Sequence, residues 1–266
     1  MNATSLVFGS LCLMFGSAAI APVAVAAQWP ERSIRAIIRW APGGSTDVVG
    51  RLLAADLTTR LKQQVVIDNR AGAGSIVGLQ FTAQAPPDGY TVLITSTAYG
   101  FLIDKPNPPV DLESFAPVAS LGFSDGAFAV TPQLPVKSVK ELIALARAKP
   151  GMLTYASSGI GGFPHLNTEL FKIITGVDIL HVPYQGGGPA AYSVMAGNTQ
   201  VYFGSLPTIM SQINSGRLKL LATGGLQRSP DFPNVPTVSE TVPGYETYIW
   251  FGMFAPRGTP PGSGLV

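Results

Sequence analysis

Residues 40–47, Trp-Ala-Pro-Gly-Gly-Ser-Thr-Asp, decide how this chain is interpreted. They follow a β-rich apolar run at 34–39 and lead into a segment of helical period that ends at Leu61. A Gly-Gly turn between strand and helix lets bare backbone approach a ligand closely. The helix start presents unpaired N–H groups and the positive end of its dipole in the same direction. This arrangement is suited to a small anion that is held by backbone groups.

A second loop of similar composition occupies 156–165, Ala-Ser-Ser-Gly-Ile-Gly-Gly-Phe-Pro-His. It lies between a strand-like run at 153–155 and a helix-like run at 166–174. Two helix starts suited to an anion, in a chain with few potential catalytic side chains, favour a binding protein over an enzyme.

The composition is that of a compact α/β protein. The chain has 266 residues, 30 Gly and 23 Pro, and only 12% of its residues are charged. The net charge is +2 and the basic residues are scattered. Because nucleic-acid binding needs clustered cations, this class of partner is excluded.

The first 27 residues contain no Asp, Glu, Lys or Arg and have an apolar middle. Ala24-Val25-Ala26 supplies small residues before a cleavage point, so 1–27 is interpreted as a signal peptide that is cleaved after Ala26 or Ala27. A transmembrane anchor is the alternative. The only cysteine, Cys12, lies inside this segment, so the mature chain would have no thiol. Export without cysteine is typical of a periplasmic protein that has no disulfide and no thiolate metal site.

Apolar β-rich runs alternate with helical segments along the rest of the chain. This alternation predicts an α/β fold with mostly parallel sheets and helices on both faces. The expected strands lie at 34–40, 64–67, 91–95, 116–121, 127–131, 153–155, 179–182, 200–203 and 218–223, and the expected helices at 46–61, 76–83, 139–148, 166–174, 189–196 and 208–214.

Two lobes are expected. The stretch 118–131 is interpreted as a strand, a turn at Ser124-Asp125-Gly126 and a second strand, where the chain would cross from one lobe to the other. With a return near 222–225, lobe one would be 28–123 together with 226–266, and lobe two would be 124–225. A ligand would bind between them, at the carboxyl ends of strands.

Polar residues that follow strands are further candidates for this cleft. Ser96, Thr97 and Tyr99 follow one expected strand, and Tyr184 and Gly186 follow another. Ordinary turn chemistry is the alternative explanation for each of them.

The titratable candidates are few. Asp47 would repel an anionic ligand at close range, so it is interpreted as a partner of the helix dipole, paired with Arg51 one turn on. His165 and His181 are the only histidines, and no carboxylate pattern joins them, so neither a metal site nor a cofactor is expected. His165 is expected near the pocket. Ser157 or Ser158 could pair with it as a nucleophile, but no Gly-x-Ser-x-Gly elbow is present.

Two other patterns have simpler explanations. Gly72-Ala73-Gly74 suggests a dinucleotide loop, but Val77 occupies the sixth position, where that motif needs glycine. Four aromatic residues near strand ends could form an apolar pocket wall, although core packing explains such residues more simply. They are Trp40, Phe123, Phe163 and Phe203.

The ordered series of short motifs resembles the Bug (TctC-like) family of periplasmic solute-binding proteins, which serve tripartite tricarboxylate transporters. The resemblance extends from Trp29 to Pro260. The motifs that carry it are Pro-Gly-Gly-x-x-Asp at 42–47, Asn-Arg-x-Gly-Ala-Gly at 69–74, Pro-Asp-Gly-Tyr-Thr at 87–91, the loop 155–165, His-Val-Pro-Tyr-Gln-Gly-Gly-Gly-Pro-Ala at 181–190, Val-Pro-Thr-Val at 235–238 and Trp-Phe-Gly-Met-Phe-Ala-Pro at 250–256.

The resemblance implies a two-lobed, Venus-flytrap fold (type II-like) that binds a carboxylate through two strand-to-helix loops. Carried onto this chain, the gripping residues are Gly43, Gly44, Ser45, Thr46 and Asp47 in the first loop, and Ser157, Ser158 and Gly159 through to His165 in the second.

The chain departs from the family in two places. Family members often carry an Asp in the loop that here contains Gly204 and Ser205, so we expect a ligand that lacks an amino group. The chain also stops at Val266, where family members continue, which makes it C-terminally short.

The sequence therefore predicts an exported, monomeric receptor. It would capture a small organic carboxylate and deliver it to integral-membrane transporter subunits, without nucleic acid, metal or cofactor. A carboxylate sensor that acts on a signalling partner is one alternative, and a serine esterase is another.

Overall fold

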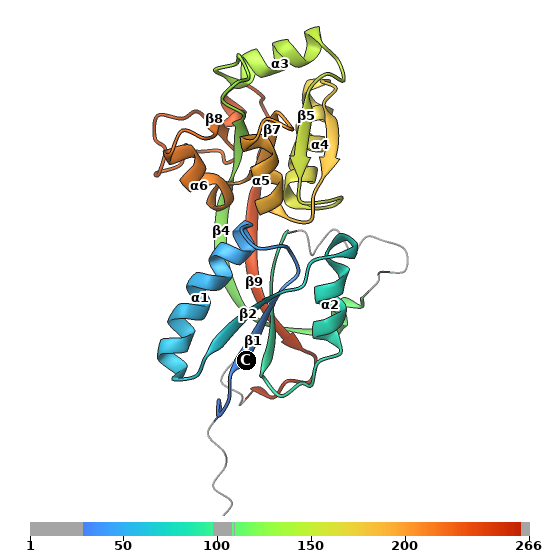
Figure 1. The fold of residues 1–266 in the computed structure, drawn as a ribbon, viewed down its shortest axis with the longest axis vertical. Coiled ribbons are helices and arrows are strands. Elements are labelled where there is room, and N and C mark those ends of the chain that lie inside the picture. The colour runs from blue at the N-terminus through green and yellow to red at the C-terminus, as the bar shows by residue number, and fades with distance from the viewer. Residues whose placement is uncertain (1–28, 98–107, 109, 262–266) are drawn as a thin grey trace, which may run out of the picture.

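The computed structural model describes residues 29–97, 108 and 110–261, which form two α/β halves joined by two long strands (Figure 1). The predicted signal peptide and Tyr99 lie outside these residues. In chain order the elements are β1 Ile34–Ile38, α1 Ser45–Leu61, β2 Val65–Asn69, α2 Ile76–Ala83, β3 Thr91–Ser96, β4 Phe115–Val130, α3 Val139–Ala148, β5 Thr154–Ser157, α4 Phe163–Thr175, β6 Leu180–Pro183, α5 Gly187–Met195, β7 Val201–Ser205, α6 Leu206–Asn214, β8 Lys219–Thr223 and β9 Tyr248–Pro256.

The strands follow the order β2-β1-β3-β9-β4-β7-β5-β6, with β8 paired to β4. Within each half the strands that are linked by helices are parallel: β2, β1 and β3 in one half, and β6, β5 and β7 in the other. β4 and β9 pair antiparallel to their neighbours and to each other. The sheets are therefore mixed rather than mostly parallel, because one connecting strand leaves the first half and the other returns to it.

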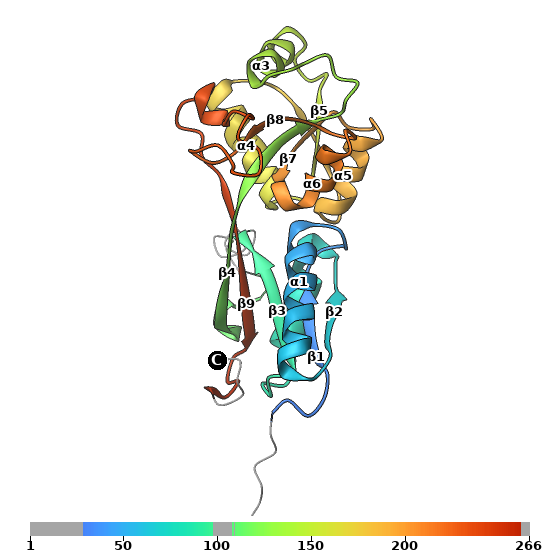
Figure 2. The same cartoon turned by 90° about the vertical axis from the view of Figure 1, so that its left-hand side faces the viewer.

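The connecting strand β4 runs without a turn through 124–126, so the predicted turn there is wrong. As far as Asp125 the strand pairs with β9, and from Gly126 onward it pairs with β7. The backbone thus stays extended while it passes from one sheet to the next (Figure 2). Its partner β9 corresponds to no strand that the sequence predicted.

Each half has its own apolar core. In the first half, Ile38 and Ile94 pack toward α1 on one face of the sheet, while Ile37 and Leu93 pack toward Leu79 of α2 on the other. This alternation follows from the two-residue period of a strand.

The second half is centred on aromatic residues. The ring centroids of Phe128 and Phe203 are 3.8 Å apart, and Tyr245 meets Phe128 edge-on at 5.1 Å. Val238 and Val242 join the same cluster. Because Val238, Val242 and Tyr245 pack in the second half, we propose that the chain returns to the first half along β9. The limits of the two lobes stay a prediction.

Local signals set the helix ends as the sequence predicted. The Ser138 side chain accepts a hydrogen bond from the Glu141 N–H at 3.2 Å and caps α3. α4 ends at Gly176, whose φ of 67° is left-handed. In the described part of the chain, no helix combines the length and the apolar character needed to cross a bilayer.

Candidate functional site

A pocket lies between the two halves, and about 370 Å³ in it is occupied by no atom, a volume that includes the opening to solvent. Five of the loops and strand ends that face the other half contribute to it, together with one residue of β9. No Asp, Glu, Lys, Arg or His occurs among the described residues of its wall. The wall is formed by Trp40, Gly44, Ser45, Thr46, Ser96, Ser158, Phe163, Pro164, Gly187, Tyr202, Ser205, Thr208 and Ile249.

The first loop contributes Gly44, Ser45 and Thr46 to the wall, at the start of α1. Gly43 and Asp47, predicted with them, do not line the pocket. Asp47 is 4% exposed and lies behind the loop, where it accepts a hydrogen bond from the Gly43 N–H at 3.0 Å. The carboxylate therefore shapes the loop from the side away from the pocket.

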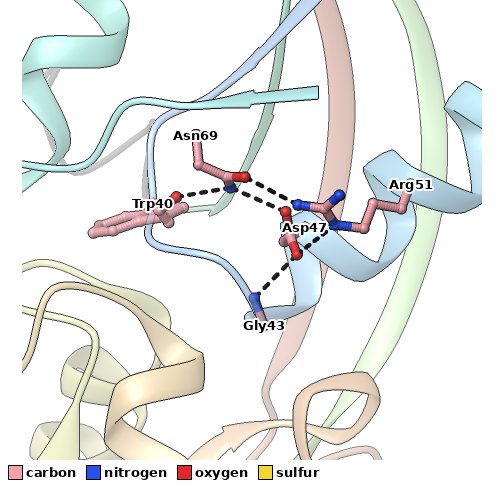
Figure 3. A network of polar contacts seen from close by, with 5 residues as sticks. All are labelled: Trp40, Gly43, Asp47, Arg51 and Asn69. Atoms are coloured by element: carbon pink, nitrogen blue, oxygen red, sulfur yellow. Dashed lines mark hydrogen bonds and ion pairs between the residues drawn. The ribbon is translucent and has the colours of Figure 1, made fainter. Parts of the chain in front are cut away.

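Two further partners complete this network around Asp47 (Figure 3). Arg51 Nε donates to the carboxylate at 2.9 Å, and Asn69 Nδ2 donates to it at 3.0 Å and to the Trp40 carbonyl at 3.1 Å. Burial by itself would raise the pKa of Asp47, but the hydrogen bonds from Arg51, Gly43 and Asn69 outweigh it and lower that pKa. The predicted Asp47–Arg51 pair is present, and the bonds from Gly43 and Asn69 to Asp47 join the loop and β2 to α1.

The second loop contributes Ser158 to the pocket wall, and α4 contributes Phe163 and Pro164 from its first turn. Ser157 is fully buried outside the wall, where its Oγ lies 2.6 Å from His181 Nε2. It also accepts a hydrogen bond from the Gly159 N–H at 3.0 Å. Ser157 and Gly159 thus set the shape of the loop.

The rings of the two histidines lie next to each other behind this loop, at an interplanar angle of 47°. His165 Nδ1 accepts a hydrogen bond from the Gly161 N–H at 3.3 Å, and its ring centroid is 4.7 Å from that of His181. Burial lowers the pKa of both imidazoles, so both are neutral near pH 7. Of the two serines predicted to pair with His165, Ser157 does contact a histidine, but that histidine is His181.

No carboxylate completes a catalytic triad here among the described residues. Glu169, the acid of this region, accepts hydrogen bonds from the Tyr155 hydroxyl at 2.7 Å and from Lys172 Nζ at 2.9 Å. Its remaining influence on the histidines is electrostatic. A buried serine, away from the pocket and next to a histidine that no acid orients, does not form the geometry of a hydrolase.

Among the other predicted residues, one lines the pocket wall and two make hydrogen bonds away from it. Ser96 lines the pocket, whereas Thr97 accepts a hydrogen bond from the Trp250 N–H at 3.0 Å and ties β3 to β9. The Tyr184 hydroxyl lies 2.6 Å from Ser193 Oγ, away from the wall.

Two loops of opposite halves touch directly beside the pocket. The Ala41 N–H donates to the Gln185 carbonyl at 3.1 Å. Gly186 has a φ of 152° and lies so near Ala41 that a Cβ on it would be 3.1 Å from the Ala41 nitrogen. Gly188 approaches the Pro42 carbonyl even more closely. The structure is therefore a closed arrangement of the two halves.

Sequence reasoning missed several residues of the wall. Tyr202, Thr208 and Ile249 were not expected there, and core packing was the preferred explanation for Trp40 and Phe163. One signal was available for Tyr202, because it stands two residues before Gly204 on a strand and so shares its face.

On β7, Gly204 itself is not part of the wall. Tyr202 covers it, and the Ser205 hydroxyl, which does line the pocket, lies 2.8 Å from the Thr208 hydroxyl.

Comparison with known proteins gives a consistent picture. The family described as "Tripartite tricarboxylate transporter family receptor" matches residues 49–263. Protein BugT of Bordetella pertussis is 38% identical over 268 residues, which cover 98% of this chain and 81% of BugT. The "UPF0065 protein in tcbD-tcbE intergenic region" of Pseudomonas sp. is 36% identical, over 87% of this chain and 70% of that protein.

Solved structures agree with the fold. The R. palustris protein Rpa4515 with adipate has a TM-score of 0.85 and 36% identity, over 88% of this chain and 80% of that chain. The periplasmic binding protein BugD has a TM-score of 0.85 and 31% identity, with the same coverage. MatC from Rhodopseudomonas palustris with bound malate has a TM-score of 0.82 and 29% identity, over 88% and 81%. The predicted two-lobed binding-protein fold is confirmed.

Proposed function

The chain belongs to the tripartite tricarboxylate transporter receptor family (Bug, TctC-like), and from that premise we propose that it captures a small organic carboxylate in the pocket between its halves. The family consists of solute-binding receptors, so the expectation that the chain is not an enzyme is confirmed. The observation that carries the proposal is the chemistry of the pocket wall, whose described residues offer hydroxyl groups and helix starts but no ionised side chain.

An anion in this pocket would be stabilised by fixed dipoles. Gly44, Ser45 and Thr46 place the start of α1 at the wall, where the first N–H groups of a helix have no partner within the helix. The start of α4 reaches the same space through Phe163 and Pro164. Closure of the halves removes water, which strengthens each of these interactions with a carboxylate.

The same wall disfavours a ligand with an ammonium group. A buried cation needs an anionic partner, and none of the described wall residues is a carboxylate. Asp47 is near, but its two oxygens already accept hydrogen bonds from three groups. We therefore propose that the ligand is an organic acid without an amino group. Adipate and malate, which accompany two of the similar structures, are of this kind.

Calorimetry on matched acids tests the proposal. The mature protein is titrated with adipate, malate, succinate and glutarate, and with aspartate and glutamate as the amino counterparts of the last two. At a ligand concentration of about 100 times Kd, binding adds about 2.7 kcal/mol to the unfolding free energy, which a thermal melt detects independently. At least one acid should bind, and each amino counterpart should bind more weakly. Absence of binding to every acid overturns the carboxylate proposal, and tight binding of aspartate or glutamate overturns the exclusion of an amino group.

Export and delivery complete the proposal. Residues 1–27 would direct the chain to the periplasm, where the monomeric receptor would present its ligand to integral-membrane transporter subunits. Cell fractionation and N-terminal sequencing of the mature protein test the first step. Uptake of the bound acid by cells with and without the gene tests the second, and unchanged uptake would contradict the transport role.

A further inference from the structure

The Tyr202 hydroxyl is buried, and its proton has no acceptor among the described residues. Tyr202 lies on β7, is 0% exposed and belongs to the pocket wall. Buried hydroxyl groups are normally paired, because an unpaired one loses its bonds to water without replacement. The Tyr202 oxygen lies beside Gly187, which is also a wall residue, so a ligand in the pocket is in a position to supply the missing acceptor.

Gly204 is what allows the ring to lie there. The two residues are on the same face of β7, and a Cβ on Gly204 would be 2.2 Å from Tyr202 Cζ and 2.3 Å from its hydroxyl oxygen. The phenol ring therefore occupies the space that any side chain at position 204 would need. A large residue at 202 and glycine at 204 form a coupled pair.

The surroundings leave the hydroxyl free to donate. A Cβ on Gly187 would be 3.2 Å from the Tyr202 oxygen and 3.5 Å from Thr208 Oγ1, so the hydroxyl lies beside the start of α5 and near Thr208. Thr208 Oγ1 itself lies 2.8 Å from Ser205 Oγ. Burial raises the pKa of the Tyr202 hydroxyl by more than a hydrogen bond from Thr208 to its oxygen lowers it, so the phenol keeps its proton.

We propose that the Tyr202 hydroxyl is a specificity-determining donor of this pocket, which donates a hydrogen bond to a carboxylate or carbonyl oxygen of the captured acid. Gly204 is the positioning residue that makes room for it. The inference rests on the proposed function and adds a named contact to it. A protonated phenol next to a glycine offers an oxygen acceptor a donor and offers an ammonium group no negative charge, which selects for acids without an amino group.

Titration of Tyr202→Phe with the acid that binds the wild type most tightly in the panel above tests the contact. The change removes one oxygen and leaves the ring over Gly204. Loss of a hydrogen bond to a charged group should weaken affinity about 10- to 100-fold. The melting temperature of the ligand-free protein should stay the same or rise, because an unpaired hydroxyl is removed.

Tyr245→Phe is the matched control. Its hydroxyl is equally buried but donates to the Asn167 carbonyl at 3.1 Å, away from the pocket. This variant should melt at a lower temperature and keep wild-type affinity. A Tyr202→Phe protein that behaves in the same way would show that the Tyr202 hydroxyl is only structural and would overturn the inference.

A double-mutant cycle tests the coupling to Gly204. Gly204→Ala should weaken binding strongly while Tyr202 is present, and should add little in a Tyr202→Ala background. Additive losses would overturn the role given to Gly204. If the wild type binds an acid and Tyr202→Phe binds it equally well, this inference fails alone. If the wild type binds no acid, the proposed function fails together with it.

Discussion

Replacing Gly188 with alanine should prevent the two halves from closing fully around a ligand. Gly188 lies in the first turn of α5 and faces the loop between β1 and α1 across the cleft. A Cβ at this position would be 2.5 Å from the Pro42 carbonyl oxygen and 3.1 Å from Gly43 Cα. Both atoms belong to backbone, so no side-chain rotation can relieve the contact.

The magnitude follows from the cost of overpacking. A methyl group forced into a well-packed contact typically costs about 1–3 kcal/mol, and here that cost arises only in the closed form. In the separate half, alanine is favoured over glycine inside a helix by up to about 1 kcal/mol. Ligand affinity should therefore fall roughly 5- to 150-fold, while the ligand-free protein is as stable as the wild type or more stable.

Two measurements on the same protein check this expectation. Calorimetry gives Kd for the acid that binds the wild type most tightly, and a thermal melt gives the stability without ligand. Ser211→Ala is the control, because Ser211 is exposed on α6, away from the pocket wall, and its replacement likewise raises helix propensity. Wild-type affinity in Gly188→Ala would refute the reasoning, since the two loops would then not approach this closely in the ligand-bound state.

Three further predictions concern stability. Asp47→Ala should lower the unfolding free energy by about 1–2 kcal/mol, because the N–H groups that now donate to the carboxylate would lose their acceptor. Asp56→Ala, which breaks an exposed pair of the same spacing in the same helix, should cost less than about 0.5 kcal/mol; equal costs in urea unfolding would contradict the special role of Asp47. Burial lowers the pKa of His165 and His181, so the unfolded chain takes up protons before the folded one, and stability should fall as pH drops below about 6.5. Replacing both histidines by asparagine should flatten this decline in melts from pH 8 to pH 5, and an unchanged slope would show that other groups cause it. Phe128→Ala should cost about 3–5 kcal/mol, measured by circular dichroism, because the aromatic core of the second half loses its central ring; a loss below 1 kcal/mol would mean that this core repacks.

The two halves touch where the loop between β1 and α1 meets the start of α5. Ala41 donates to Gln185 across the cleft at the point where the glycines of both halves meet. Because glycine has no Cβ, the two backbones approach each other closely beside the pocket. The first loop that the sequence marked for anion binding, 40–47, therefore also forms part of the contact between the halves.

Much of the site was predictable because its signals are local. A Gly-Gly turn before a helix, the Asp47–Arg51 spacing and the glycine that ends α4 each depend on a few consecutive residues. From them the sequence alone determined the alternating α/β organisation, both helix starts at the pocket, the cap of α3 and, through composition, the absence of thiol chemistry from the chain after residue 27.

What the sequence could not determine is which distant segments meet. β9 carries Gly252 in its middle and shows no regular alternation, so only its pairing with β3 and β4 reveals it as a strand, and Ile249 reaches the pocket with it. The pairing of Ser157 with His181 depends on the parallel register of β5 and β6. Tyr202 of the second half and Trp40 of the first half line the same pocket because the two halves come together there. Such contacts join residues far apart in the chain, and they are decided by packing in three dimensions, which no local pattern of residues encodes.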